Sequence, residues 1–226
     1  MKKLGWLPDA IRDPLVRWKR QHQHSKLERL QRSELKHQLQ KHSIKKVIVG
    51  SSNTKFDGWV STNKINLNLL NETDWLRYFK RDPIDAILAE HVWEHLTPDQ
   101  ALIAAAQCFK FLKPGGYLRV AVPDGNHNDP SYIEWVRPGG NGPGSDDHRV
   151  LYTHETFSQL FSSVGFEVNL LEYFDNQGEF HSTDWDTEAG MIQRSKMFDK
   201  QLFDRSKSGG NFEFTSIILD ARKPQK

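Results

Sequence analysis

Four side chains in two polar loops have the types and spacing needed for proton transfer. Asp124 and His127 lie in one loop, and Asp147 and His148 lie in a second, glycine-rich one. Histidine changes its protonation near neutral pH and a carboxylate can orient it, so these residues are candidates for deprotonating a hydroxyl or an amine. Asp, Asn and Gly also build turns, which is the alternative role.

A second chemical pattern is the string His-Val-Trp-Glu-His at residues 91–95. Its H-x-x-E-H spacing is that of inverted zinc peptidases, in which two histidines bind zinc and the glutamate activates water. We do not favour zinc, because the string directly follows a buried strand and no later helix offers an obvious third ligand. The alternatives are that His95 and Trp93 pack while Glu94 meets water or caps a turn, or that Glu90 or His91 lies beside a ligand.

These residues need a scaffold, and the chain alternates short apolar runs with amphipathic segments. Strands are expected at residues 46–50, 59–62, 85–90, 117–122, 167–174 and 212–221, and helices after Asn71, Thr97 and Thr153. Such alternation predicts an α/β fold with a mainly parallel sheet and helices on both faces. Ligands of these sheets bind at the carboxyl ends of the strands, where the strand order reverses.

The N-terminal residues 1–45 form a separate basic extension before an α/β domain at residues 46–226. Residues 1–46 carry 13 Lys/Arg and 4 Asp/Glu, a net charge of +9, whereas the whole chain has +2. The extension is expected to be helical in two parts, the first interrupted by Pro8 and Pro14, the second at residues 25–41. An apolar stripe on the first part is expected to be buried against the body or a second copy, and consists of Leu4, Leu7, Ile11, Leu15 and Trp18.

The composition narrows the classes of partner. No segment has the apolar length of a membrane span and the start lacks an apolar signal core, so a cytoplasmic protein is expected. The single cysteine, Cys108, predicts a buried packing residue rather than a nucleophile. Nucleic-acid binding is not favoured, because residues 1–46 lack interleaved aromatic and basic side chains. Contact of residues 1–24 with a membrane surface and formation of a homo-oligomer stay open.

Several motifs follow one another along the chain. They are Val-Gly-Ser-Ser-Asn at 49–53, Gly-Trp-Val at 58–60, Glu-His-Val-Trp-Glu-His-Leu at 90–96, Leu-Lys-Pro-Gly-Gly at 112–116 and Val-Gly-Phe at 164–166. Together they resemble the class I S-adenosylmethionine (SAM)-dependent methyltransferases. More narrowly, they resemble bacterial predicted methyltransferases often linked to sugar or polysaccharide pathways. The likeness covers about residues 46–221.

This resemblance implies a Rossmann-like fold and SAM as the cofactor, bound by Gly50, Ser51, Ser52, Asn63, Glu90 and His91. Two positions depart from the family pattern. Ser52 stands where a second glycine is normal, and Asn63 or a neighbour stands where an acidic residue normally binds the ribose hydroxyls. A neutral amide oxygen binds hydroxyls more weakly than a carboxylate does, so these departures bear on SAM affinity.

The expected function is therefore methyl transfer from SAM to an oxygen or nitrogen of a small or glycan-like acceptor. The acceptor side is expected to contain Asp124, His127, Asp147 and His148, because the strand ending at Val122 emerges beside the cofactor half. No metal ligands are assigned, although by resemblance to some sugar O-methyltransferases a divalent ion on these Asp and His side chains stays open. The alternative is a non-catalytic binding or scaffold protein with an altered cofactor site.

A polar insertion of about 37 residues, at about 175–211, separates the last two expected strands. Its position predicts a lid or an acceptor wall over the same edge of the sheet, with Trp185 as a stacking surface for a sugar or ring. Plain loop packing is the alternative.

Overall fold

The computed structural model describes residues 9–52, 54–198 and 212–225. The side chains of residues 9–15 and of Lys19 lie outside this description. The predicted stripe residues Leu4 and Leu7, and the side chains of Ile11 and Leu15, therefore fall outside it as well.

Within the described residues, one seven-stranded sheet has the order β2-β1-β3-β4-β7-β5-β6. Its strands are β1 (Lys46–Ile48), β2 (Val60–Ser61), β3 (Ile84–Glu90), β4 (Leu112–Pro123), β5 (Glu167–Phe174), β6 (Phe180–Ser182) and β7 (Ser216–Arg222). The pairings β1–β2, β1–β3 and β3–β4 are parallel, whereas β7 is antiparallel to both β4 and β5. The predicted α/β, Rossmann-like fold is confirmed, but the sheet is mixed rather than mainly parallel, because the pairing of β5 with β6 is antiparallel as well.

The strand order reverses beside β1, and this determines where the functional loops meet. From β1 the chain continues to β2 on one side and then returns to β3 on the other. The loops that follow β1 and β3 therefore diverge over a crevice at the carboxyl end of the sheet. In register, Ile48 pairs with Leu88, so Gly50 and His91 come just beyond the ends of adjacent strands.

Four of the described helices begin directly after a residue whose side chain caps them, namely Asn71, Thr97, Asp129 and Thr153. The helices are α1 (Asp9–Gln40), α2 (Glu72–Phe79), α3 (Pro98–Phe111), α4 (Pro130–Val136) and α5 (His154–Val164), with 3₁₀ turns η2 (Trp93–His95) and η3 (Ser145–Asp147). At the start of α3, Thr97 accepts a hydrogen bond from the Gln100 amide, and the Gln100 side chain accepts one from the Thr97 amide. This capping box accounts for the helix start after Thr97, which was expected from the sequence and is confirmed.

The two faces of the sheet are covered differently. Helices α2, α3 and α5 pack with one face in the main apolar cluster, which includes the fully buried Cys108. The cluster on the other face contains Ile48, Leu88 and Ile218 and is completed by Ile192 and Trp185 of the insertion. In the described part of the chain, the insertion takes the place of the helix layer expected on that face, because its apolar side chains cover the sheet there.

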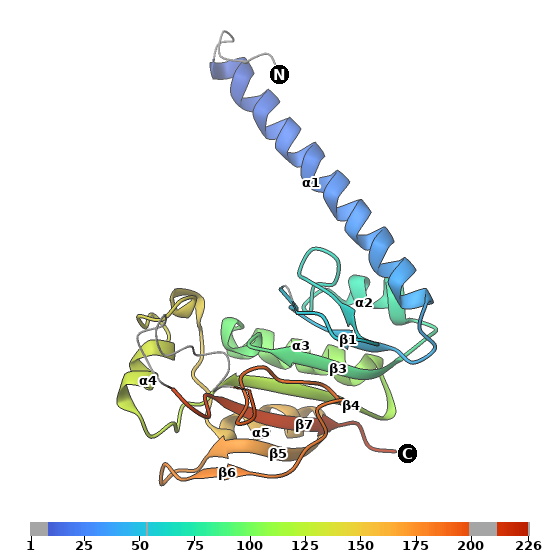
Figure 1. Ribbon diagram of the computed structural model, residues 1–226. Helices are drawn as coiled ribbons and strands as arrows, with labels where there is room; N and C mark the ends of the chain where they lie inside the picture. Colours follow the sequence, from blue (N-terminus) through green and yellow to red (C-terminus); the bar gives the residue numbers. More distant parts are fainter. Residues whose placement is uncertain (1–8, 53, 199–211, 226) are drawn as a thin grey trace.

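Helix α1 is one continuous helix, not two, and it extends away from the sheet (Figure 1). Trp18 is 60% exposed and stacks on His22, so the expected burial of this stripe residue is wrong within one chain. Burial begins near the C-terminal end of the helix, where Leu35 and Leu39 join the main cluster. None of the described helices has both the length and the apolar character that crossing a membrane requires.

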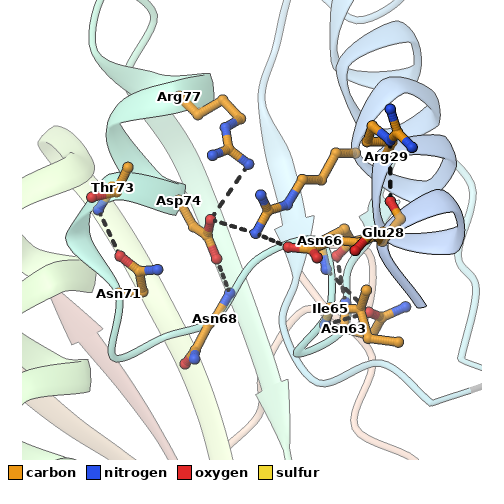
Figure 2. A network of polar contacts seen from close by, with 12 residues as sticks. Glu28, Arg29, Asn63, Ile65, Asn66, Asn68, Asn71, Thr73, Asp74 and Arg77 are labelled. Carbon is orange, nitrogen blue, oxygen red and sulfur yellow. Dashed lines mark hydrogen bonds and ion pairs between the residues drawn. The ribbon is translucent and has the colours of Figure 1, made fainter. Parts of the chain in front are cut away.

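A buried carboxylate attaches α1 to the body (Figure 2). Asp74 of α2 lies 3.2 Å from Arg32 Nη2 of α1 and 3.6 Å from Arg77 Nη1. Its second oxygen accepts a hydrogen bond of 3.1 Å from the Asn68 amide. Asp74 thus connects α1, α2 and the loop after β2, and this loop lines one side of the crevice.

Two leucines of α1 test how the helix is held. Leu35→Ala should lower the free energy of unfolding by about 2–4 kcal/mol, because Leu35 is only 3% exposed in the main cluster. Leu30→Ala is the matched control, since Leu30 is 59% exposed and its truncation should change stability by less than about 0.5 kcal/mol. Urea titration followed by circular dichroism measures both. Equal effects of the two substitutions would contradict this placement of α1.

Candidate functional site

Two adjacent cavities open at the carboxyl end of the sheet. The first, here the Gly50 cavity, has a volume of about 610 Å³. It is lined by Gly50, Lys64, Leu67, Asn68, Leu69, Leu70, His91, Val92, His95, Leu96, Thr97, Gln100, Asp147 and Arg149. The second, the Glu94 cavity, has about 230 Å³ and is lined by His91, Glu94, His95, Trp135, Val136, Pro143, Gly144, His148 and Arg194. Because His91 and His95 line both, the cavities are neighbours.

The Gly50 cavity combines an apolar wall with a charged rim. Leucines 67, 69 and 70 from the loop after β2 face the segment after β3, and Lys64, Asp147 and Arg149 carry its charges. Gly50 has a φ of +61°, and a Cβ atom there would come within 2.7 Å of Val92 Cγ2. Glycine is therefore required at this position both by its backbone and by the close approach of the next loop.

His91 stands between the cavities in a backbone conformation that side chains seldom adopt, with a φ of +53°. Its Nε2 lies 3.1 Å from Ser216 Oγ of β7, and its Nδ1 lies 3.0 Å from Glu94 Oε1. Burial, and next the charge of Arg194, hold the pKa of His91 well below its usual value. The imidazole is therefore neutral at physiological pH, and the strained turn keeps it directed into the site.

Glu94 is the most buried charged group of the site, with 1% of its side chain exposed. Neither carboxylate oxygen accepts a hydrogen bond within the described residues. Its contact with His91 Nδ1 has the distance of an ion pair but not the angles of a hydrogen bond. Burial raises the pKa of Glu94 to about 7.

Two further histidines surround this carboxylate. The rings of His95 and His148 meet edge to face, with centroids 4.9 Å apart. His148 Nδ1 donates a hydrogen bond of 2.6 Å to the Val136 carbonyl, and His95 Nδ1 lies 3.6 Å from Asp147 Oδ2. The Arg149 amide donates a hydrogen bond of 2.6 Å to the Glu94 carbonyl, which holds the His148 loop against η2.

The structure separates the four residues that the sequence assigns to the acceptor side. His148 lines the Glu94 cavity and Asp147 lines the Gly50 cavity. Asp124 and His127 line neither of them. The loop after β4 turns toward β5 and residues 212–215 instead, so these two residues lie in a different environment from His148.

Asp124 has a structural role in this arrangement. It is fully buried, and its two oxygens accept hydrogen bonds from the amides of Phe174 (2.7 Å) and Asn126 (2.9 Å). Burial raises the pKa of Asp124 to about 6, although both hydrogen bonds act in the opposite direction. The carboxyl thus joins the end of β4 to the end of β5.

His127 has both ring nitrogens engaged. Nε2 donates to the Glu213 carbonyl at 2.9 Å, and Nδ1 accepts a hydrogen bond from the Asp129 amide at 3.0 Å. The ring packs between Tyr132 and Phe174, and burial lowers its pKa. With both nitrogens bound to the backbone, His127 has no free lone pair with which to accept a proton.

Only two of the six residues expected at the cofactor line the Gly50 cavity. Gly50 and His91 line the Gly50 cavity, but Ser51, Ser52, Asn63 and Glu90 do not. Ser52 adopts a φ of +48°, the conformation for which glycine is the preferred residue. The Glu90 carboxylate accepts hydrogen bonds from the amides of Gln193 (3.1 Å) and Arg194 (2.7 Å), so it holds the insertion.

Asn63 caps its own loop below α1 (Figure 2). Its side-chain oxygen accepts a hydrogen bond of 2.8 Å from the Ile65 amide, and its amide nitrogen donates at 3.3 Å to Gln31 of α1. It lines a third cavity of about 650 Å³ between α1 and β2, here the Gln31 cavity. No carboxylate takes its place in the Gly50 cavity at the end of β2, and Lys64 lines that side instead.

The insertion is fixed by packing, and its tryptophan is not a free stacking surface. Trp185 stacks on Arg119 of β4 at 4.8 Å, and its Nε1 donates to Glu172 at 2.8 Å. Trp135 of α4 lines the Glu94 cavity instead, together with Arg194. Trp135 was not predicted from the sequence, since nothing in its local pattern distinguishes it from a packing residue.

The peptidase interpretation of residues 91–95 is wrong. An H-x-x-E-H zinc site needs both histidines on one face of a helix, but only Trp93–His95 form a 3₁₀ turn and His91 is left-handed. His91 also directs its nitrogens to Ser216 and Glu94 rather than to His95.

The chain was compared with protein families and with solved structures. A family model described as a methyltransferase domain matches residues 51–171. A SAM-dependent methyltransferase from Archaeoglobus fulgidus is similar in structure at 17% identity, with a TM-score of 0.45 over 85% of this chain and 94% of that one. One from Thermotoga maritima is similar at 15% identity, with a TM-score of 0.44 over 95% and 97%. No curated protein sequence matches the chain significantly.

The structural role of Asp124 leads to a pH prediction. Its folded-state pKa of about 6 exceeds the ordinary value of 3.8, so the folded protein binds the extra proton between these values. The ionised buried carboxyl therefore costs stability above pH 6, and this cost, up to about 3 kcal/mol, disappears as the pH falls toward 4. Asp124→Asn should accordingly destabilise the protein more at pH 4 than at pH 7, as measured by urea unfolding. A difference between wild type and variant that is independent of pH would contradict this assignment.

Proposed function

The chain belongs to the SAM-dependent methyltransferase family, and from this premise we propose that it methylates an oxygen or nitrogen atom of a small or glycan-like acceptor. The observation that carries the proposal is the pair of neighbouring cavities with a common wall at His91 and His95. One cavity has the size of a nucleoside site, and the other is smaller and rich in polar groups. Transfer between two substrates requires such an arrangement, because the reacting atoms must meet within about 3–3.5 Å.

The Gly50 cavity fits the methyl donor in size and chemistry. Its volume of about 610 Å³ lies within the range of small-molecule sites. The leucine wall after β2 and Val92 suit a flat adenine ring, and Lys64, Arg149 and Asp147 suit the charged carboxylate and ammonium of the methionine part. When bound, SAM supplies an electrophilic methyl group on its sulfonium and leaves as S-adenosylhomocysteine.

The Glu94 cavity suits the acceptor. Trp135 offers an aromatic face to a sugar or another ring, and Arg194 and His148 offer polar contacts for its substituents. The chain's contribution is to orient the acceptor, exclude water and take up the released proton in the cavity shared by His91 and Glu94. Because His91 and His95 line both cavities, the methyl group and the acceptor atom would meet beside these two side chains.

A second function, ligand binding without methyl transfer, is supported by one observation. Asn63 is bound to Gln31 and its own loop, so among the described residues the ribose-binding carboxylate usual in the family has no counterpart at the end of β2, where Lys64 lines the Gly50 cavity. The loss of this carboxylate is expected in a protein that no longer binds the cofactor. The two functions differ in whether S-adenosylhomocysteine binds.

The proposal predicts that S-adenosylhomocysteine binds in the Gly50 cavity. Isothermal titration calorimetry should show one site per chain, and Val92→Trp should weaken binding at least about 10-fold because the larger ring fills the space above Gly50. Leu102→Trp is the control, since Leu102 is exposed on α3 and lines no part of the cavity. Methyl transfer to a panel of sugars and amines is measured through the amount of S-adenosylhomocysteine that is released. Absence of binding to the wild type, or equal binding by the two variants, would refute the donor site.

A further inference from the structure

Three side chains with metal-binding atoms meet in the Glu94 cavity. Glu94, His95 and His148 each offer one ligand atom, and these atoms all lie within 4.8 Å of one another. Bonds of about 2.1 Å to one ion place its ligand atoms at most about 4.2 Å apart, so modest side-chain torsions bring these three into range. Two of them come from η2 and the third from the loop after η3.

The carboxylate of Glu94 lacks the partners that a buried charge requires. It is 1% exposed, and among the described residues no donor makes a hydrogen bond to either oxygen. An unpaired carboxylate in such a place costs several kcal/mol unless a cation or hydrogen bonds compensate. Arg194 lines the same cavity, yet no ion pair joins it to Glu94 in the described part of the chain. A cation bound beside Glu94 in this cavity would compensate the buried charge.

His95 and His148 each have one ring nitrogen directed at an oxygen atom, as histidine ligands of metal ions usually do. His148 Nδ1 donates to the Val136 carbonyl, which leaves Nε2 with its lone pair. His95 Nδ1 faces Asp147, 3.4 Å from its carbonyl oxygen and 3.6 Å from Oδ2, which leaves Nε2 in the same state. A hydrogen bond from one ring nitrogen to a carbonyl or a carboxylate is the usual way in which proteins orient the other nitrogen toward a metal.

We propose that Glu94, His95 and His148 bind one divalent transition-metal ion of the zinc type, with Asp147 orienting His95. Two imidazoles and one carboxylate are the protein ligands of several catalytic zinc sites, which keep a further position open for water or substrate. Imidazole nitrogens also favour zinc over magnesium or calcium, which prefer oxygen ligands. The open position faces the cavity that Trp135 and Arg194 complete.

The role of this ion rests on the proposed function, whereas its binding does not. A hydroxyl oxygen of the acceptor bound at the open position would lose its proton more readily, as water does on zinc. The oxygen then forms its bond to the methyl carbon while the carbon–sulfur bond breaks and its electron pair stays on sulfur. The proton leaves through His91 or solvent. Metal binding can be measured without donor or acceptor, so failure of one claim is distinguishable from failure of the other.

A second His/carboxylate cluster on the β5–β6 hairpin serves as a matched control. Asp175, Glu179 and His181 also bring ligand atoms within 4.8 Å, but the cluster is solvent-accessible. Two of its three side chains already have partners, because His181 Nε2 lies 2.6 Å from Asp175 Oδ2 and Asp175 Oδ1 accepts hydrogen bonds from two amides. This cluster is therefore not expected to hold an ion.

The test is a titration of the full chain with Zn²⁺ alone after chelator treatment, by calorimetry and by the shift in melting temperature. We expect about one ion per chain with a dissociation constant at or below the micromolar range. Glu94→Gln and His148→Ala should each weaken binding at least about 100-fold, Asp147→Asn about 10-fold, and His181→Ala not at all. Circular dichroism of the metal-free variants verifies that they are folded.

The proposal would be overturned if the wild type bound no Zn²⁺ at concentrations up to millimolar. Equal affinity of the wild type and of folded Glu94→Gln and His148→Ala would do so as well, and loss of binding in His181→Ala would move the site to the hairpin. Replacement of Zn²⁺ by Co²⁺ provides a further readout, because a site with few ligands gives intense visible absorption that octahedral cobalt lacks. This spectrum should vanish in His148→Ala, and its persistence there would also contradict the assignment.

Discussion

The buried carboxylate of Glu94 is the group on which the candidate site depends, because a charge so far from water must be compensated locally. Burial raises its pKa to about 7, and His91 Nδ1 lies 3.0 Å from its Oε1. The backbone of the same residue accepts hydrogen bonds from the amides of Arg149 and Val150, so the loop that carries His148 is held where its ring meets the carboxylate. One residue thus joins the segment after β3 to the segment before α5 and forms part of the wall of the Glu94 cavity.

The sheet makes this meeting possible. β1, β3 and β4 are parallel neighbours, so the residues that follow them emerge at one edge, and the reversal of strand order opens the crevice beside Gly50. The insertion completes the other face, where the buried Arg119 pairs with Asp220 and donates to the carbonyls of Asp186 and Gly190. Since Glu90 binds two amides of the same insertion, the end of β3 and the position of Arg194 are coupled.

Local sequence determined much of the fold but only part of the site. The helix starts at Thr97 and Thr153 and the buried run of β3 depend on neighbours in the sequence, and they were predicted correctly. Which aromatic side chain remains available depends on distant partners: Trp185 is taken up by Arg119, whereas Trp135 lines the cavity. His148 was a candidate from the sequence, but its closeness to the H-x-x-E-H string was not predicted, because it follows a 3₁₀ turn more than fifty residues later rather than a helix. Asp124 and His127 have the right types for catalysis, but their backbone partners on β5 and at Glu213 direct them elsewhere.

The most direct test of the account is a crystal structure of the full chain with S-adenosylhomocysteine. We expect the adenine to lie against the leucine wall and Val92. The thioether sulfur should lie at the His91–His95 boundary and face the cavity that contains Glu94 and Trp135. In that position the methyl group of the donor would enter the acceptor cavity. The opposite result is the ligand in the Gln31 cavity beside Asn63, or its sulfur directed away from the Glu94 cavity, and either would contradict the proposed site.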